Sequence, residues 1–401
     1  MIIVGGTYDE YCLEPRWEEK FGSGLRGSRV FNSLSPKENI DFYTFGDDNT
    51  SYFLELLSKE FPKIKSHITP IDKQISFYYD HPLINPRIFP RPDTINRSLN
   101  SMNITGKNIL YYGFFEGNAK VAGDYVVYDP QSPANPVPFS KTGSKAQNLV
   151  YIVNQSEASY LAKSFKVAKI KEYFFKVEKV DVLVLKMGPK GAMVVTNKGK
   201  NSTIIPVYKT PLVWPIGTGD VFAAVFAFHW FSSKDAIKSA KQASICTAAY
   251  SHTRNFNFSK INLYSPLEIK TYPKGQVYLA GPFFTYSERW LIDQVRCAFI
   301  DLNLKVFSPW HDIGHGLASE VVEKDLKGLA KSKLVFAILD GLDSGTLFEI
   351  GYAVSKKIPV IAYVENESEE SVKMLEGTSC ILERDLTTAI YKTLWLLSEN
   401  V

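Results

Sequence analysis

Twenty consecutive residues, 334–353, restrict the fold of this chain more than any other stretch. They begin with six apolar residues, 334–339, which predict a buried strand; an acidic, glycine-containing turn follows at 340–345, and then a helix. Glu349 lies near the start of that helix, between apolar Phe348 and Ile350. Ligands of open parallel sheets bind just beyond the carboxyl ends of the strands. Glu349 is therefore a candidate nucleophile or base, although a carboxylate there also complements the helix dipole.

The surrounding sequence repeats the alternation of strand and helix. Four apolar segments, 276–280, 305–308, 334–339 and 358–363, are separated by stretches with helical periodicity. Strands that alternate with helices are typical of a parallel sheet covered on both faces. The C-terminal part of the chain is therefore predicted to be a doubly wound α/β domain.

Residues 276–365 resemble the nucleoside 2-deoxyribosyltransferase family. The resemblance rests on the segments VYLAGPFF (277–284), EKDL (323–326), LAKSK (329–333), DSGT (343–346) and EIGYA (349–353), which occur in the family's order. It implies a flavodoxin-like doubly wound parallel sheet and the cleavage of an N-glycosidic bond. It implies no cofactor for this domain.

The resemblance also implies roles for single residues. Glu349 is expected to attack the anomeric carbon, Asp325 to handle protons on the departing base, and Tyr278 to orient Glu349. Asp343 is expected to bind a sugar hydroxyl. An oxocarbenium-like transition state needs an anion on one face and a proton at the leaving group, which fits these residue types. Tyr278 as a plain strand residue, Asp325 as a helix-surface charge and Asp343 as a turn former remain open.

The loop after the first of these strands is expected to contact substrate. Gly281 ends the strand, and Phe283 and Phe284 are expected to stack on a base. Ser287 and Arg289, a little further on, are candidate phosphate ligands, or in the case of Arg289 a helix-surface charge. A free nucleoside is favoured over a nucleoside monophosphate because the loop resembles the transferase form.

A second motif, Pro-Ile-Gly-Thr-Gly-Asp at 215–220, precedes an apolar helical stretch. Backbone amides at the start of such a helix form an anion site. Asp220 beside them is placed to take a proton from a hydroxyl that attacks a phosphoryl group. An acid that merely caps the helix is the alternative.

Residues 1–265 resemble the ribokinase (PfkB) family of sugar and nucleoside kinases. The matching segments are 3–9, 22–27, 154–157, 184–192 and 217–220. The resemblance implies a three-layer α/β/α domain with Mg-ATP as cofactor, and Asp220 as catalytic base. It implies substrate contacts at Asp9 and Gly24. It implies contacts to ATP or its phosphates at these six positions: Asn154, Glu157, Lys186, Gly188, Gly217 and Gly219.

No metal is expected to be held by direct protein ligation, although magnesium is expected near Glu157. Simpler alternatives stay open for these residues: a loop acid for Asp9, a helix cap and its partner for Asn154 and Glu157, and a strand-edge charge for Lys186.

Two further features depart from the family. Residues 214 and 215 are Trp-Pro where the family has Asp-Thr, and four prolines at 82, 86, 90 and 92 predict a reduced lid or an extended arm, because proline interrupts strand ladders.

Composition limits the remaining choices. The chain has 401 residues, which favours more than one domain; we expect domains at 1–265 and 274–401, with a link near 256–275. A net charge of +4 is too small to predict nucleic-acid binding. No apolar run has the length of a membrane span. The four scattered cysteines and the absence of a signal-like start predict a cytoplasmic protein. No internal repeat is apparent.

These observations predict a nucleoside or nucleotide salvage enzyme that cleaves or exchanges the N-glycosidic bond of (deoxy)nucleosides, fused to a sugar or nucleoside kinase-like domain. Its expected partners are small nucleosides, nucleotides and pentoses, together with further copies of the same chain. The alternatives are a nucleotide-sensing module with a degenerate kinase domain, and a nucleoside monophosphate N-glycosidase. Cleavage of a dinucleotide cofactor is a weaker third alternative.

Overall fold

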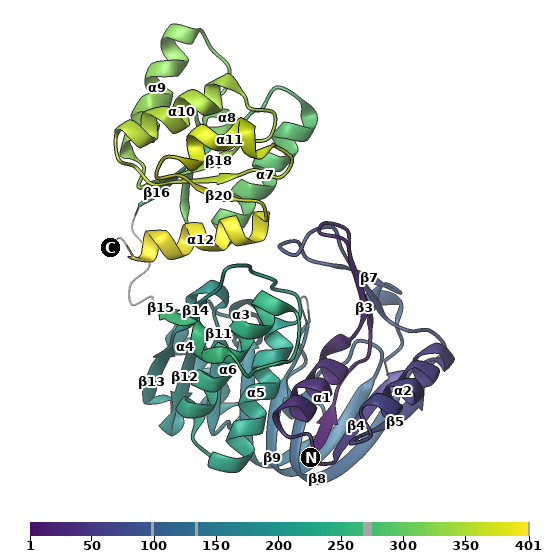
Figure 1. The fold of residues 1–401 in the computed structure, drawn as a ribbon. Coiled ribbons are helices and arrows are strands. Elements are labelled where there is room, and N and C mark those ends of the chain that lie inside the picture. The colour runs from purple at the N-terminus through teal and green to yellow at the C-terminus, as the bar shows by residue number, and fades with distance from the viewer. Residues whose placement is uncertain (98–99, 133–134, 268–274, 400–401) are drawn as a thin grey trace. The chain divides into compact units, whose positions relative to one another are not determined.

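The computed structural model describes residues 1–97, 100–132, 135–267 and 275–399. Contacts divide the chain into two units, one formed by Met1–Thr210 and Trp214–Glu268, the other by Pro211–Val213 and Ile269–Val401 (Figure 1). Most of the link expected near 256–275 is described, but its residues 268–274 lie outside the described part of the chain. No helix within the described residues is long and apolar enough to cross a membrane.

The first unit is built on a nine-stranded sheet. In spatial order its strands are β13 (Asn201–Ile205), β12 (Ala192–Thr196), β11 (Val182–Lys186), β10 (Lys145–Asn154), β9 (Asn118–Asp129), β8 (Ser101–Tyr112), β1 (Ile2–Val4), β4 (Ile40–Gly46) and β5 (Ile64–Pro70). All neighbours are parallel except at β11–β12 and β12–β13. The helices of this unit are α1 (Gly22–Leu34), α2 (Asp48–Glu60), α3 (Gln155–Ala162), α4 (Val167–Lys176), α5 (Thr218–Ser233) and α6 (Ala236–Thr253).

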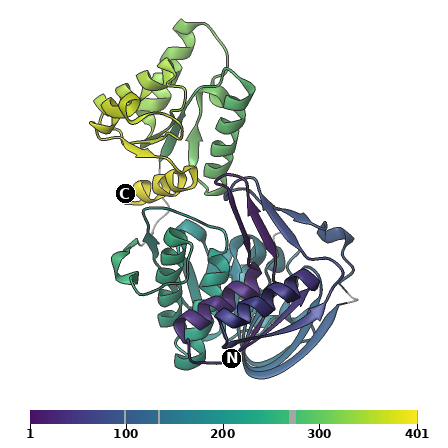
Figure 2. The ribbon, with the colours of Figure 1, turned by 45° about the vertical axis from the view of Figure 1, so that its right-hand side comes forward.

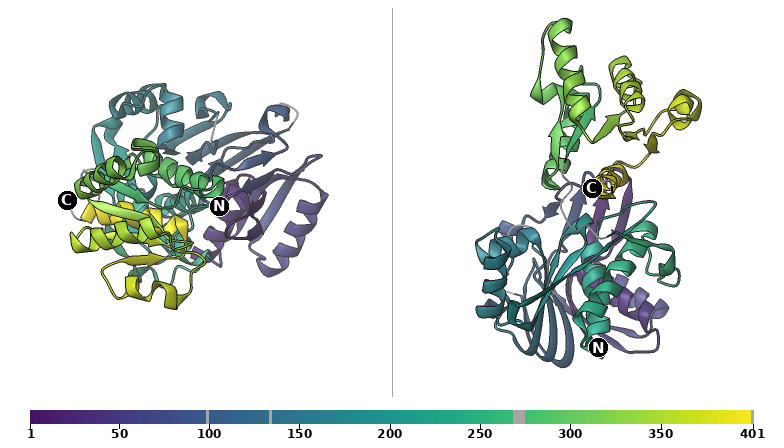
Figure 3. Two further views of the ribbon diagram at one scale, coloured as in Figure 1. Left: turned by 90° about the horizontal axis from the view of Figure 1, so that it is seen from above. Right: turned by 90° about the vertical axis from the view of Figure 1, so that its left-hand side faces the viewer.

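Both faces of this sheet are buried, so its strands are apolar on both sides. In β10, Val150 and Ile152 belong to the core cluster formed with α1, α5 and α6. Tyr151 and Val153, which point the other way, belong to the cluster formed with α3 and α4. Alternation of neighbours between two faces follows from the pleat of a strand. The predicted three-layer α/β/α architecture is confirmed (Figures 1 and 3).

Strands β8 and β9 fold back on themselves. They pair in parallel, with Ser101 beside Asn118 and Tyr112 beside Asp129, yet only residues 113–117 connect them. A straight strand of this length covers about 40 Å, whereas the connection reaches about 20 Å. Each strand must therefore bend, and the ladder is interrupted just after the paired glycines Gly106 and Gly123. Figure 2 shows the blue strands curving round.

Both arms of each bent strand pack into one core cluster. Its members from the two strands are Met102, Ile104, Ile109, Tyr111, Ala119, Val121, Val126 and Tyr128. The two arcs are 17 residues apart, since position 118 pairs with position 101.

A separate small sheet contains Asp9, one of the predicted substrate contacts. Its strands are β3 (Trp17–Lys20), β2 (Asp9–Cys12), β6 (Ser76–Tyr79) and β7 (Arg87–Phe89). Figure 2 shows the purple strands β2 and β3 extending from the body of the unit. Strands of three or four residues occupy the region where the prolines predicted a reduced lid or an extended arm. The short strands β14 (Val207–Lys209) and β15 (Ser265–Leu267) form a further antiparallel pair.

The second unit has an all-parallel sheet of five strands. Their order is β17 (Lys305–Phe307), β16 (Gln276–Ala280), β18 (Leu334–Ile338), β19 (Val360–Tyr363) and β20 (Ile381–Glu383). The helices are α7 (Tyr286–Asp301), α8 (Pro309–Asp312), α9 (Ala318–Lys331), α10 (Ser344–Ser355), α11 (Glu369–Glu376) and α12 (Leu386–Glu399). Read in chain order, the strands follow the sequence 2-1-3-4-5, which is the flavodoxin-like arrangement. The predicted doubly wound sheet is confirmed.

Helices cover both faces of this sheet: α7 and α12 pack on one, and α9, α10 and α11 on the other. Figure 1 shows α12 on the opposite side of the strands from α10 and α11. The four predicted strands are present, and the last of them begins at Val360 rather than at residue 358. The fifth, β20, was not predicted, because a three-residue strand leaves no readable alternation.

Candidate active site

The strand order of the second unit creates a crevice position at one edge of the sheet. Strands β16 and β18 are neighbours, and the chain leaves β16 through α7 on one face of the sheet and β18 through α10 on the other. Ligands of doubly wound sheets bind at such a reversal, beyond the carboxyl ends of the strands. The loops that follow β16 and β18 contain Gly281, Phe283, Phe284 and Asp343, and Glu349 lies in the second turn of α10.

Glu349 is held by one hydroxyl group. Tyr278, which is fully buried in β16, donates a short hydrogen bond from its phenol to Glu349 Oε1. Burial raises the pKa of Glu349 to about 7; the bond from Tyr278 lowers it, and the charges of Asp325 and Asp343 raise it further. Burial and the neighbouring Glu349 raise the pKa of Tyr278 well above its usual range, so the phenol stays protonated. Glu349 is thus a half-buried carboxylate that ionises near neutral pH.

Asp325 approaches the same place from α9. Its Oδ1 atom is buried and has no hydrogen-bond partner within the described chain. Burial raises the pKa of Asp325 to about 6. A buried carboxyl oxygen without a partner costs free energy of roughly 1–3 kcal/mol, which proteins tolerate mainly where a ligand or a reaction uses the group. The geometry brings Asp325, Tyr278 and Glu349 together, as their predicted roles require.

Asp343 has a structural role whatever else it does. It is the N-cap of α10, and its Oδ2 atom accepts hydrogen bonds from the amide and the hydroxyl of Thr346, at 2.8 and 3.0 Å. This satisfies one of the free amides at the helix start. Asp340, in the turn after β18, accepts bonds from the amides of Glu365 and Asn366 and so joins two loops.

Three aromatic rings, from the loop after β16 and from α8, form a stack. Phe283 stacks on Phe284 and on Trp310, with centroid distances of 5.3 and 5.7 Å. The guanidinium of Arg289 lies 5.4 Å from the centroid of the Trp310 ring and donates bonds to the carbonyls of Phe283 and Phe284. Arg289 therefore fixes the loop. Sequence reasoning missed Trp310, because the short helix α8 that carries it lies in a segment with no readable periodicity.

In the first unit, Asp220 is placed as predicted at the start of a helix but is not free. Gly217, with φ of 77°, turns the chain into α5, and Asp220 lies buried in the first turn. Its Oδ2 atom accepts a bond of 2.7 Å from Arg26 of α1. Arg26 also makes two bonds to Glu10 of β2, with the shorter at 2.5 Å, and its Nε donates to the hydroxyl of Tyr250. Burial alone would lower the pKa of Arg26, but Glu10, Tyr250 and Asp220 together raise it well above its usual value.

Lys186 lies beside the same helix start. A Cβ atom added to Gly219 would lie 3.3 Å from Lys186 Nζ, so the two are adjacent. The ammonium group also pairs with the fully buried Asp129 at 2.6 Å. Burial would lower the pKa of Lys186, whereas Asp129 and Glu157 raise it. A cation beside the amides of a helix start is suited to bind phosphate, and Asp129 is a neighbour that the sequence did not suggest.

The remaining predicted residues of this unit have clear structural partners. Asn154 and Glu157 form a reciprocal capping box at the start of α3, which is the simpler alternative left open for them. Burial nevertheless raises the pKa of Glu157 to about 7. Asp9 pairs with Lys20 across β2 and β3 at 2.5 Å. Gly24 allows α1 to approach β1, since an added Cβ would lie 2.4 Å from the carbonyl oxygen of Gly5.

Gly188 stands at φ of 57° in the turn after β11. Residue 214, where the family motif is interrupted, is a buried tryptophan that packs edge-on against Trp17. No cluster of three or more potential metal-ligating side chains occurs among the described residues. The structure therefore brings Lys186, Gly217, Gly219 and Asp220 together, but it places Asp9 in an ion pair of its own.

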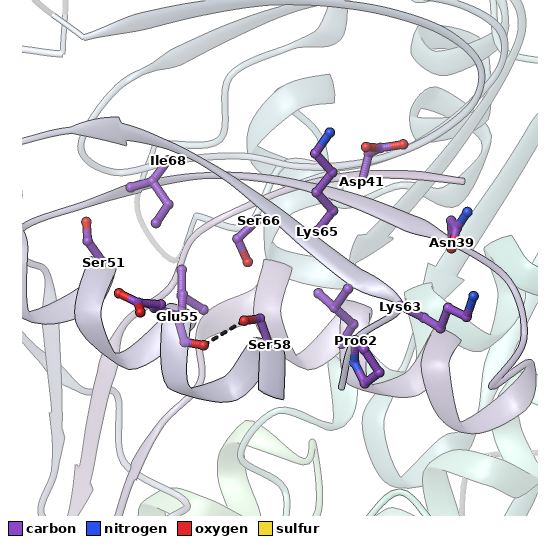
Figure 4. Close-up of a pocket in the computed structure, with 12 residues that line it drawn as sticks. Asn39, Asp41, Ser51, Glu55, Ser58, Pro62, Lys63, Lys65, Ser66 and Ile68 are labelled. Carbon is purple, nitrogen blue, oxygen red and sulfur yellow. Dashed lines mark hydrogen bonds between the residues drawn. The ribbon is translucent and has the colours of Figure 1, made fainter. Parts of the chain in front are cut away.

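A hollow of about 760 Å³ lies elsewhere on the first unit, against α2 and β5. Figure 4 shows its lining, in which the Ser58 hydroxyl donates to the carbonyl of Glu55 at 2.6 Å, with Lys63, Lys65 and Asp41 nearby. None of the residues predicted to be functional lines it.

Two parts of the chain match known families. Residues 277–380 match the model of the nucleoside 2-deoxyribosyltransferase family, and residues 117–257 match that of the pfkB family of carbohydrate kinases. No curated protein matches the chain.

Several solved structures of the ribokinase family are similar to the first unit. A fructokinase from Vibrio cholerae O395 is 14% identical, with 64% of this chain and 95% of that chain covered and a TM-score of 0.47. A ribokinase from Thermotoga maritima is 16% identical over 66% of this chain and 95% of its own, with a TM-score of 0.45. A nucleoside kinase from Methanocaldococcus jannaschii is 14% identical over 64% and 93%, with a TM-score of 0.45. By its family matches, the chain joins a pfkB carbohydrate kinase segment to a nucleoside 2-deoxyribosyltransferase segment.

Proposed function

We propose that the second unit cleaves the N-glycosidic bond of nucleosides, with Glu349 as the nucleophile, and that residues 1–265 and 274–401 act as separate domains. The observation that carries the proposal is the pairing of two unlike carboxyl groups. Glu349 has a hydrogen bond from Tyr278, whereas Asp325 has a buried oxygen with no partner among the described residues. Two carboxyl groups in different environments are what an oxocarbenium-like reaction uses.

The reaction proceeds in two steps. A Glu349 carboxylate oxygen bonds to the anomeric carbon as the bond from that carbon to the base nitrogen breaks, and Asp325 supplies the proton that the departing base needs. A second base or a water molecule then attacks the anomeric carbon, releases Glu349, and returns a proton to Asp325. Transfer and hydrolysis differ only in this second acceptor.

The hydrogen bond from Tyr278 has a defined part in this chemistry. It keeps Glu349 in one orientation, and it stabilises the ionised form against the effect of burial. The aromatic loop residues Phe283 and Trp310 supply flat apolar surface on which a base can stack. Arg289 is already bonded to two loop carbonyls, which favours a free nucleoside over a nucleoside monophosphate as substrate.

The test is chromatography of ribonucleosides, deoxynucleosides and their monophosphates after incubation with the full chain, with and without an added acceptor base. Free base that appears with the intact protein and not with Glu349→Ala supports the proposal, and dependence on the acceptor identifies a transferase. Every substrate remaining intact at high protein concentration would refute it.

A second candidate function belongs to the first unit. The ammonium group of Lys186 lies next to Gly219 at the start of α5, and Glu157 lies near it, which supports phosphate binding at this position. Mg-ATP, when bound there, supplies the phosphoryl group. We propose nucleotide binding at this position, to be tested by calorimetric titration of the full chain with Mg-ATP and Mg-ADP, using Lys186→Met as the comparison.

A further inference from the structure

Arg26 is buried at the start of α5, beside Asp220. Its side chain is 1% exposed and connects three elements: α1, β2 through Glu10, and α5 through Asp220, which lies 194 positions further along the chain. A Cβ atom added to Gly217 would lie 2.3 Å from Arg26 Nε, so the guanidinium lies directly against the turn that begins α5.

A cation in this position is unusual on electrostatic grounds. The start of an α-helix carries positive partial charge and attracts anions. Arg26 is tolerated there because two carboxylates, on Glu10 and Asp220, compensate both its charge and that of the helix. Four donor contacts of the guanidinium are used: two to Glu10, one to Asp220 and one to Tyr250. The ion-pair network is thus complete without any ligand.

Two cations lie against the α5 start. The ammonium group of Lys186 lies next to Gly219 and pairs with Asp129. The guanidinium of Arg26 lies against Gly217 and binds one carboxylate oxygen of Asp220. A carboxylate that removes a proton from a hydroxyl must reach that hydroxyl within hydrogen-bond distance. Arg26 therefore binds the carboxylate, that of Asp220, that would have to accept the proton.

We propose that Arg26 is a positioning residue that withholds Asp220 from phosphoryl transfer, so that the resting protein binds phosphate on the Lys186 side without using Asp220 as a base. Separating one partner from a buried ion pair is costly, and we expect the Arg26 contact to suppress Asp220-dependent transfer on the order of 100-fold. This inference concerns the first unit and is independent of nucleoside cleavage by the second.

The test is a gain of function in the full chain. The double variant Glu10→Gln/Arg26→Met removes the network and conserves the local net charge. The original site carries two negative charges and one positive charge, and the variant carries the single negative charge of Asp220. We expect ADP release from Mg-ATP in the presence of ribose, deoxyribose or nucleosides to rise at least tenfold in this variant. Adding Asp220→Asn to the double variant should cancel the gain. A purely structural Arg26 could only lose activity when replaced.

A second readout does not depend on choosing the right acceptor. Coupling of carboxylates to glycine ethyl ester with a water-soluble carbodiimide, followed by peptide mass mapping, should label Asp220 faster in the double variant than in the original protein. The exposed Asp48, at the start of α2, should be labelled equally in both and serves as the control. Three outcomes would each overturn the proposal: equal labelling of Asp220 in the two proteins, Asp220-dependent transfer as fast in the original protein as in the double variant, or no gain in a double variant that melts cooperatively.

Discussion

Glu349 and Asp220 occupy similar places in the chain and opposite electrostatic environments. Each follows a glycine-containing turn and lies early in a helix. Burial raises the pKa of Glu349 to about 7, with two nearby acids adding to the rise and the hydrogen bond from the neutral phenol of Tyr278 opposing it. Asp220 is bonded to a buried guanidinium. The same local motif therefore presents a chemically available carboxylate in one unit and an ion-paired one in the other, and the long-range partners decide which.

The largest test of this contrast removes the available carboxylate. Glu349→Gln keeps the side chain's shape and its contact with Tyr278, but it removes the nucleophile, so release of free base should fall by about 10³-fold or more. Chromatography of the products measures it. The exposed acid Glu376 on α11 offers a matched control, because Glu376→Gln should leave the rate unchanged. An equal loss in both variants would show that the measured activity does not use Glu349.

Replacing the unpartnered acid should have the next largest effect. Asp325→Asn removes proton delivery to the leaving base and should lower the rate about 100-fold. A nucleoside whose base leaves without protonation should be affected much less, because it does not need the proton. If both kinds of substrate slow equally, Asp325 supports the site rather than acting on the leaving group. The comparison of the two substrates is the measurement.

Tyr278→Phe should slow the reaction about tenfold, which is the size expected for loss of one hydrogen bond to a charged group. Because the bond from Tyr278 lowers the pKa of Glu349, its loss should raise that pKa above the original value of about 7. Activity requires ionised Glu349, so it falls as pH decreases through this pKa. The acidic limb of the profile of kcat/KM against pH should therefore move to higher pH in the variant. If the limb does not move, a group other than Glu349 controls it.

The smallest effects should differ in sign between the two carboxylates. The raised pKa of Glu349 means that the folded state binds its proton more tightly than the unfolded chain, so stability falls as pH rises from about 4.5 through about 7. Glu349→Gln should thus stabilise the second unit by about 1–2 kcal/mol at pH 8 and hardly at all at pH 4.5. Asp220→Asn breaks a buried ion pair and should destabilise the first unit by about 1–3 kcal/mol. Thermal unfolding at the two pH values measures both stability changes. If both variants were stabilised, or both destabilised, the two carboxylates would not differ in the way proposed.

Sequence patterns predicted what depends on neighbours along the chain. Local periodicity and turn chemistry predicted four of the five strands of the second unit and the helix starts at Gly217 and Asp343. They also predicted the proximity of Glu349 to the carboxyl ends of parallel strands. Asn154 and Glu157 were also readable, since a capping box has a fixed spacing of three residues.

What the sequence did not predict depends on contacts between distant residues. Arg26 and Asp220 are 194 positions apart, and nothing near either one indicates their pairing. The sequence predicted a functional role for Asp9, but its neighbour Glu10 is the residue that joins the Asp220 network. The two are adjacent in β2, and successive side chains of a strand point to opposite faces. How the small sheet joins the large one determines that Glu10, and not Asp9, points toward the start of α5.

The bent strands β8 and β9 have a consequence for how this unit can change in length. Inserting one residue between positions 118 and 123 would exchange the inward and outward side chains of that arm, which would expose Ala119 and Val121 and bury their polar neighbours. Inserting a complete arc of 17 residues, the spacing between Ser101 and Asn118, would instead leave every ladder in register. Growth or shortening on this face of the sheet is therefore modular: it proceeds by whole arcs, as in a solenoid.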